Sequence, residues 1–370
     1  MRVRRLFSLT VALLAVVALS GCGFLRRPAP ADGKAQFVAL LEYIPGQIAE
    51  VQHAPRLIGY PIHYLDVARM RADLGVRRIS GASNRKDKLS LITGLKTQGL
   101  GFAPIDLTSA TAYEEWGFDI ADVAQSLCLP IDQLAIIAGN LALETIDERL
   151  IQKGYAASSE GEYILYSATD AEWTFFLKPG LLLIGPDERY LRAFIAQKAD
   201  PSSSLAQHPS MQALLGEIQP MWGALLTDAG DLRALRELVL ERMAQLSEEM
   251  QAKIRAADPY LTGDPCEYRW DYAVLAFRNS GGQANMHLMY HFASEKWAGE
   301  GASLLPDQLA RNHTLANPDR TWADLLSIQQ CVARGPVLVL DAITSHNTLL
   351  GASVQHEDLG FLPIYCPAEP

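Results

Sequence analysis

Apolar residues recur at two different spacings along the chain, and each spacing predicts a different element. Between Gln133 and Lys198, short apolar runs alternate with segments whose apolar residues fall at every third or fourth position. Short runs indicate strands, whereas the wider spacing indicates helices that bury one face. We expect strands at residues 134–138, 163–167, 173–177 and 181–185, and helices at 144–153 and 187–195.

A similar order returns after a Ser- and Pro-rich linker at residues 199–209. Strands are expected at 222–227, 272–277, 286–292 and 337–340, and helices at 231–257, 306–311 and 322–332. Two of these strands form a predicted hairpin across Asn279-Ser280-Gly281-Gly282. The apolar stripe of helix 231–257 is typical of core packing, and the alternative is contact with a partner helix.

The first third of the chain has a more helical pattern. We expect a broken helix at 37–54 interrupted by Pro45-Gly46, a helix at 64–74 capped by Asp66, and a helix from Glu114 with Ile120, Val123 and Leu127 on one face. The predicted fold class is α+β, with two tandem split βαββα (ferredoxin-like) modules, largely antiparallel sheets and a helical N-terminal region. The modules are expected at 36–200 and 201–370.

The first 22 residues have the layout of a secretory signal. Arg2, Arg4 and Arg5 form a basic start, and an apolar run follows at residues 6–19. This run is shorter than the roughly 20 residues that a membrane-spanning helix needs.

The signal ends in Leu19-Ser20-Gly21-Cys22, which resembles the lipobox of bacterial lipoproteins. The resemblance implies cleavage before Cys22, attachment of diacylglycerol to its thiol and acylation of the new amine. Residues 1–21 are then the signal peptide, and 22–35 form a flexible tether rich in Pro, Ala and Gly. Several acyl chains hold a protein stably on a membrane surface. The alternative is an ordinary signal peptide with a cysteine nearby.

The same resemblance implies a location on the extracytoplasmic side of the cell envelope. Residue 23 is Gly rather than the Asp that resembles an inner-membrane retention signal. We therefore expect the outer membrane where the cell has two.

Composition indicates a folded, acidic body. The chain is 49% hydrophobic and 20% charged, with a net charge of -10. Such a chain can bury a sizeable core. We see no block of Lys and Arg that would act as a local patch, and an acidic body repels phosphate backbones, so no nucleic-acid partner is expected.

Four cysteines remain beside Cys22, and an exported protein is expected to form at least one disulfide. They are Cys128, Cys266, Cys331 and Cys366. Three pairings are open, and the sequence does not choose among them. The surroundings of Cys128 favour a small buried residue.

The sharpest candidate for metal chemistry is His287-Leu288-Met289-Tyr290-His291. On a strand, His287, Met289 and His291 point to one face, where two imidazoles and a thioether are a weak candidate copper site. The simpler interpretation is a half-exposed strand with polar residues outward.

Signals for catalysis are weaker still. Gly81-Ala82-Ser83-Asn84 and Gly351-Ala352-Ser353-Val354 both lack the last glycine of a nucleophile elbow. Ser353, His356 and Asp358 lie too close in sequence to predict a triad. Adjacent carboxylates such as Glu114 and Glu115 are usually solvated. We therefore assign no catalytic residue.

The body also resembles uncharacterised bacterial lipoproteins, best over residues 113–198. The shared features are Trp116-Gly117-Phe118-Asp119, an apolar strand running into Gly139-Asn140, Lys153-Gly154-Tyr155 and Leu183-Ile184-Gly185. This resemblance implies no activity.

The expected function is binding without catalysis at the membrane surface, with an envelope protein, a glycan or a small ligand as partner. No cofactor is expected beyond the covalent acyl chains. The alternatives are an envelope hydrolase with a site between the two modules and a solute-binding lipoprotein of a transporter.

Overall fold

The computed structural model of the chain describes residues 33–46, 61–76, 79–96, 104–129, 133–228, 244, 247–249, 251–252, 270–280, 283–311 and 320–344. The described residues all belong to one compact unit. None of the described helices is both long and apolar enough to cross a bilayer.

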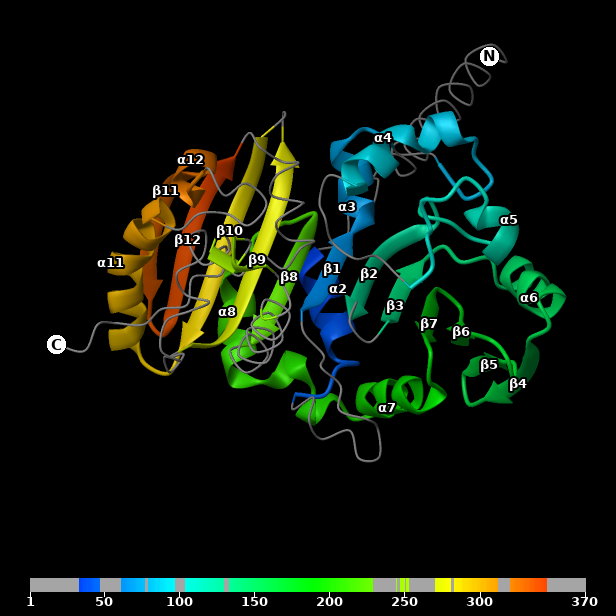
Figure 1. Cartoon of the computed structure of the whole chain (residues 1–370). Coiled ribbons are helices and arrows are strands. Elements are labelled where there is room, and N and C mark those ends of the chain that lie inside the picture. Colours follow the sequence, from blue (N-terminus) through cyan, green and yellow to red (C-terminus); the bar gives the residue numbers. More distant parts are fainter. Residues whose placement is uncertain are drawn as a thin grey trace, which may run out of the picture. The chain divides into compact units, whose positions relative to one another are not determined.

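The described strands form a single twelve-stranded sheet in which every neighbouring pair is antiparallel. The strands before residue 200 are β1 (Ile62–Asp66), β2 (Val123–Leu129), β3 (Leu134–Gly139), β4 (Ala156–Glu160), β5 (Tyr163–Ser167), β6 (Thr174–Lys178) and β7 (Leu181–Gly185). Those after it are β8 (Gly223–Asp228), β9 (Trp270–Ser280), β10 (Gln283–Phe292), β11 (Ser327–Arg334) and β12 (Val337–Thr344). Their order is β11-β12-β10-β9-β8-β1-β2-β3-β7-β6-β5-β4 (Figure 1).

The same strand order recurs in the two halves of the sheet. From the centre outward, one half runs β1-β2-β3-β7-β6 and the other runs β8-β9-β10-β12-β11. The hairpin β4–β5 is an addition to the first half. The two halves join where β1 pairs with β8, with Ile62 opposite Leu226 and Tyr64 opposite Ala224.

This topology is α+β with a large antiparallel sheet, as the sequence predicts. Helices lie in the longer connections between strands, with α3, α4 and α5 between β1 and β2 and α11 and α12 between β10 and β11. The assignment to two tandem ferredoxin-like modules stays a prediction.

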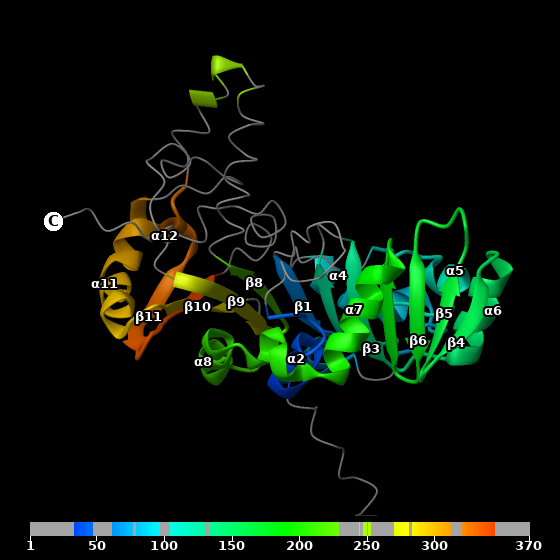
Figure 2. The ribbon, with the colours of Figure 1, turned by 90° about the horizontal axis from the view of Figure 1, so that it is seen from below.

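Helices cover both faces of the sheet. The face that we call face 1 is covered by α3 (Val67–Asp73), α4 (Arg85–Lys96), α6 (Leu143–Gln152), α11 (Glu295–Arg311) and α12 (Trp322–Leu325), with the short α5 (Ala112–Trp116) beside α6. Face 2 is covered by α2 (Gly33–Leu41), α7 (Glu188–Ala199) and α8 (Pro209–Glu217). Short 3-10 turns at Pro201–Ser203 and Leu205–Gln207 lead from α7 into α8. Figure 2 shows α2 and α8 along the same side of the strands.

Because both faces are covered, most strands bury side chains in both directions. In β10, Met286, Leu288, Tyr290 and Phe292 belong to the core of face 1, whereas Met289 belongs to the core of face 2. This alternation in β10 is the one that the sequence predicts. It places His287 and His291 on face 2 with Met289.

Most predicted strands and several helices are confirmed. The strands β3, β5, β6, β7 and β8 and the hairpin β9–β10 lie where the pattern predicts them. Helix α6 ends before Gly154, which has a φ of 88°, a conformation that glycine adopts without strain. Asp66 caps α3, because its side chain accepts a hydrogen bond from the Arg69 amide at 2.8 Å.

Three segments predicted as helix contain strands. Residues 64–66 belong to β1, residues 123–129 form β2, and most of the predicted helix 322–332 is β11. Helix α5 ends after one turn because Gly117, with a φ of 79°, lies against the backbone of Thr145. The predicted helix at 306–311 is the end of the longer α11.

A buried ionic cluster fixes the segment between α4 and β2. The ammonium group of Lys88 forms an ion pair with Asp119 and donates to the carbonyl of Gly81 at 2.6 Å. Asp122 accepts from the Gly81 amide at 2.9 Å. Burial raises the pKa of Asp122, although the amides of Gly81 and Asp119 donate to its carboxylate and oppose that shift. Asp119 is the last residue of the Trp116–Asp119 segment that the sequence analysis noted. Because its carboxylate pairs with the buried Lys88, its role is structural.

Replacing Asp119 with Ala is expected to lower the free energy of unfolding by about 3–5 kcal/mol, because it leaves the buried Lys88 charge uncompensated. Urea denaturation measures the change. The control is Glu300→Ala, which removes the exposed Lys296–Glu300 pair on α11 and should cost under about 1 kcal/mol. Equal losses in the two variants would contradict the assignment.

Candidate functional site

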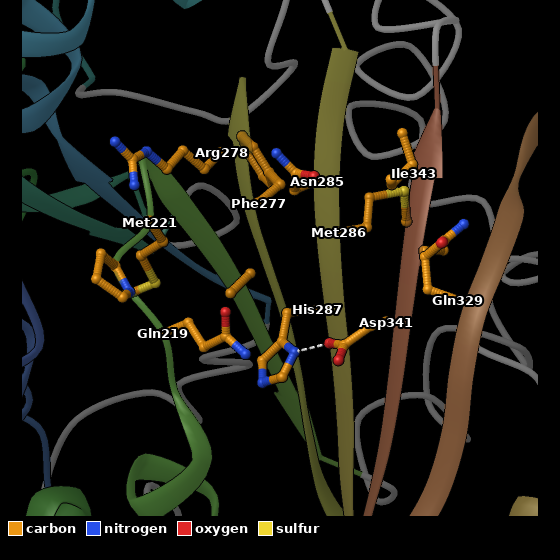
Figure 3. Close-up of a pocket in the computed structure, with 13 residues that line it drawn as sticks. Gln219, Met221, Phe277, Arg278, Asn285, Met286, His287, Gln329, Asp341 and Ile343 are labelled. Carbon is orange, nitrogen blue, oxygen red and sulfur yellow. Dashed lines mark hydrogen bonds and ion pairs between the residues drawn. The ribbon is translucent and has the colours of Figure 1, made fainter. Parts of the chain in front are cut away.

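A pocket of about 290 Å³ opens on face 2, where α8 ends. The segment 219–221 bounds it on one side, and the ends of β9, β10 and β12 form its floor, with Gln329 of β11 at the far side (Figure 3). Helix α8 packs on β9, β10 and β12. It ends at Glu217, and the sheet beyond this residue is left open to form the pocket.

His287 lies at the base of the pocket and holds the end of α8. Its Nδ1 contacts the Asp341 carboxylate, and its Nε2 lies 3.0 Å from the carbonyl oxygen of Glu217. A helix leaves its last carbonyls without partners, and a His donor there satisfies one of them. Both imidazole nitrogens therefore face hydrogen-bond acceptors. Neither of them is open to a ligand or a substrate proton.

Asp341 is engaged through both carboxylate oxygens. One oxygen contacts His287, and the other accepts from the Nε2 of Gln330. A bulge in β11 between Ile328 and Gln330 shifts the register there and brings Gln330 opposite Asp341. Bulges often re-aim side chains in this way. The acid and the imidazole of the pocket are thus bound to groups of the protein itself.

The rim of the pocket is fixed by a contact between distant segments. Arg278 of β9 binds Asp73 of α3 through two hydrogen bonds of 2.8 and 2.9 Å, and the indole of Trp222 donates to Asp73 at 2.7 Å. Partial burial acts to raise the pKa of Asp73, but the hydrogen bonds from Arg278 and Trp222 hold it below its usual value. A guanidinium bound in this bidentate way is a rigid rim group.

The pocket has uncharged polar groups at its mouth and apolar side chains inside. Gln219 and Asn285 are exposed carboxamides, each of which can donate and accept hydrogen bonds. Figure 3 shows Asn285 beside Arg278, with Met221 and Ile343 on opposite sides of the pocket. This combination suits recognition of an uncharged polar group next to an apolar one.

The predicted candidate metal ligands do not converge. His287, Met289 and His291 do share one face, as predicted, but His287 and His291 are four residues apart on a strand and therefore about 13 Å apart. Each binds a different carboxylate, Asp341 for His287 and Asp271 for His291 at 2.8 Å. Met289 is fully buried in the core of face 2. The described residues contain no group of three or more His, Cys, Asp or Glu arranged to hold a metal ion.

A second polar cluster on face 2 contains a serine, an aspartate and a histidine. Asp271 lies in its middle, bonded to the hydroxyl of Ser210 and to Nδ1 of His291. In a hydrolytic triad the histidine lies between the serine and the acid, so that it can take the serine proton. The order found here joins α8 to β9 and β10 instead, which is a structural role.

The described cysteines, Cys128 and Cys331, are free thiols. Burial raises the pKa of Cys128 to about 12 and that of Cys331 to about 11. Both thiols therefore stay protonated near neutral pH and are poor nucleophiles. Cys266 and Cys366 lie outside the described residues, as do Cys22, the apolar stripe of 231–257 apart from a few residues near its end, and the group Ser353, His356 and Asp358.

The sequence pattern predicts His287 as a candidate site residue but does not predict the residues that surround it in the structure. Asp341, Gln330 and Arg278 reach the site from three strands, two of them far from His287 in sequence. One signal was available: Asp341 interrupts an otherwise apolar strand, Val337–Thr344. An acid at such a position needs a partner inside the fold.

Comparisons with known proteins assign neither a family nor a function. No protein-family model and no curated protein matches the chain. Among solved structures, the chain is similar to TP0453. Crystal form III gives a TM-score of 0.42 at 10% identity over 85% of this chain and 97% of that chain. Form I gives 0.40 at 8% identity over 84% and 98%, and form IV gives 0.37 at 9% over 84% and 96%.

The cluster around Asp271 predicts a change in stability with pH. Burial acts to raise the pKa of Asp271, but hydrogen bonds from His291 and Ser210 hold it below its usual value. A carboxyl whose pKa is lowered on folding stabilises the protein above its unfolded pKa of about 3.9, and this contribution is lost as the pH falls through the folded pKa.

As the pH falls from about 5 to about 2.5, the free energy of unfolding of Asp271→Asn should therefore decrease less than that of the wild type. Urea denaturation at each pH measures it. Ser210→Ala keeps the carboxylate but removes one donor and should lie between the two. Parallel curves for all three proteins would show that Asp271 does not contribute in this way.

Proposed function

We propose that this protein is a lipid-anchored lipoprotein on the extracytoplasmic side of the bacterial cell envelope, and that it works by binding a partner at the face 2 pocket without catalysis. The N-terminal pattern ending in Leu19-Ser20-Gly21-Cys22 supports the anchor. Several acyl chains at Cys22 would hold the body at a membrane surface. The pocket supports the binding role.

One observation carries the choice of binding over catalysis. The ionisable groups at the base of the pocket are bonded to each other and to the backbone: His287 to Asp341 and to the Glu217 carbonyl. A general base needs a nitrogen or oxygen within reach of the substrate proton. The exposed carboxamides that line this pocket belong to Gln219, Asn285 and Gln329, and carboxamides recognise hydrogen-bonding groups and do not transfer protons.

The size of the pocket supports a protein partner that inserts a side chain. About 290 Å³ lies at the lower limit of the range that drug-sized ligands occupy. An apolar side chain with an adjacent backbone amide would fill the apolar interior and bind the carboxamides at the mouth. The partner proposed is therefore another envelope protein, with a small ligand as the alternative.

Two other functions have less support. A hydrolase needs a triad-like order that the Ser210, Asp271 and His291 cluster lacks. A solute-binding lipoprotein usually has two α/β lobes, whereas the described strands of this chain form one antiparallel sheet.

The two predicted modules are also part of the proposal, now defined by their strand order. We infer that residues 36–200 and 201–370 are two copies of one unit with the strand order β1-β2-β3-β7-β6 and its counterpart β8-β9-β10-β12-β11. In this view the face 2 pocket lies in the second copy.

A photo-crosslinking amino acid at Asn285 tests the pocket in native cells. We expect one dominant protein adduct, because Asn285 is exposed at the pocket mouth. The matched position is Glu148, which is exposed on α6 in the other half of the sheet. Adducts that are absent at Asn285, or identical at both positions, would contradict the pocket as the binding site.

The anchor is tested separately with Cys22→Ser. This variant should move from the membrane fraction to the soluble fraction, and mass spectrometry of the wild type should find an acylated N-terminus at Cys22. A wild-type protein with an unmodified Cys22 would remove the anchor and leave the pocket result untouched.

A further inference from the structure

Helix α4 presents a basic face to solvent. Its inner stripe, Lys88, Leu91, Ile92 and Leu95, is buried. Its outer side contains Arg85, Lys86, Leu89 and Lys96, which we call the α4 basic face and which are all exposed. At about 100° per residue these four positions lie within roughly a third of the helix circumference. The acid of this helix, Asp87, lies outside that arc.

This face contrasts with the chain as a whole, whose net charge is -10. Arg85 and Lys86 are adjacent in the sequence, and Lys96, 11 residues after Arg85, returns to the same side of the helix. None of the three forms an ion pair with another described residue. Their charges are therefore available to an external anion.

The position of two of these cations is unfavourable for the helix itself. Arg85 and Lys86 occupy the first turn of α4, which begins at Arg85. The helix dipole favours acidic residues there and disfavours cations. Local rules of this kind are most often broken where function requires it. Together with the dipole, the two side chains concentrate positive potential at this end of the helix.

An apolar side chain stands among the cations. Leu89 is 53% exposed, the most exposed of the described large hydrophobic residues. Nucleic acids are bound by cations and aromatic stacking, for which a leucine offers little. A face that combines Lys and Arg with exposed leucine is typical of helices that lie on a membrane surface. The combination therefore favours an anionic lipid surface over a polyanion in solution.

The start of the folded unit is connected to α4 through α3. The carbonyl of Gly33 accepts from the Tyr64 hydroxyl at 3.1 Å, and the carboxylate of Asp66 lies against Gly33. Asp66 caps α3, and Leu74 at the end of α3 lies against α4 at Gly94. Helix α3 is about 10 Å long. The chain before Gly33, counted from Cys22, can span about 36–40 Å, so an anchor at Cys22 leaves α4 within reach of the same membrane.

We propose that the α4 basic face binds the headgroups of anionic phospholipids and orients the folded body on the membrane. Arg85, Lys86 and Lys96 contact phosphates, and Leu89 enters the boundary between headgroups and acyl chains. This surface is separate from the face 2 pocket, because α4 covers face 1. It also needs no acyl chain at Cys22, so its failure and the failure of the proposed function are distinguishable.

The test uses the chain from residue 22 onward with Cys22→Ser, mixed with vesicles of phosphatidylglycerol and phosphatidylcholine or of phosphatidylcholine alone. We expect cosedimentation with the anionic vesicles only. The variant with Arg85→Gln, Lys86→Gln and Lys96→Gln should bind about a hundredfold more weakly, since each cation near an anionic surface contributes about fivefold. Circular dichroism checks that it remains folded.

Two matched controls separate this face from general charge and general hydrophobicity. Lys296→Gln, Arg311→Gln and Arg320→Gln together remove the same charge from exposed positions elsewhere and should leave binding within twofold. Leu89→Trp should shift its fluorescence to shorter wavelength with anionic vesicles, whereas Leu304→Trp, at another exposed leucine, should not.

Equal effects of the two triple variants, or equal shifts of the two tryptophans, would overturn the proposal. Binding to an oligonucleotide or to heparin at physiological salt without binding to vesicles would also overturn it and indicate a soluble polyanion as the partner.

Discussion

The pairing of β1 with β8 is the constraint on which the rest of the described fold depends. It joins the two halves into one sheet, with Ile62 opposite Leu226 and Tyr64 opposite Ala224. All four side chains are fully buried. Either half alone would present this strand as a bare edge with apolar residues, which is a template for aggregation. The pairing removes that edge and lets helices cover both faces continuously.

The position of the pocket is set by the helix that covers face 2 of the second half. Helix α8 packs on β9, β10 and β12 of the second half and ends at Glu217, where His287 satisfies a carbonyl. The contact of Arg278 with Asp73 then ties a strand of the second half to a helix of the first. The groups at the base of the pocket are used to hold the fold together. That use leaves the carboxamides at its mouth and the apolar surface within it for a partner, which is the reason that we propose binding at this site and not proton transfer.

The sequence predicted the elements that are periodic on their own and failed where the pattern has two meanings. The hairpin β9–β10 and the strands β3 and β7 have apolar runs bounded by turn residues, and they were predicted correctly. In β2 and β11 the apolar residues also fit helical spacing, and only pairing with neighbouring strands decides between the two. Strand β4, Ala-Ala-Ser-Ser-Glu, is exposed along most of its length and carries no apolar pattern that could have revealed it.

The site and the basic face show the same limit in three dimensions. His287 and Asp341 are 54 residues apart, and Arg278 and Asp73 are 205 apart. No local spacing predicts such contacts. The metal interpretation of His287, Met289 and His291 used only the alternation of a strand, which gives the shared face correctly but does not show that each imidazole has its own acid. The cations of α4 form no block of Lys and Arg in the sequence, because Lys96 lies 11 residues after Arg85; only the helix brings it back to the same side, since 11 residues at about 100° each complete about three turns.

Native-state hydrogen exchange tests the central claim most directly, because it measures the free energy of opening at each backbone amide. If the β1–β8 pairing makes one cooperative sheet, the slowest amides of β1–β3 and of β8–β10 will open at the same free energy, equal to that of global unfolding. If the strands of the second half open at a distinctly lower free energy while those of the first remain protected, the two halves are independent and the account of a single sheet is contradicted.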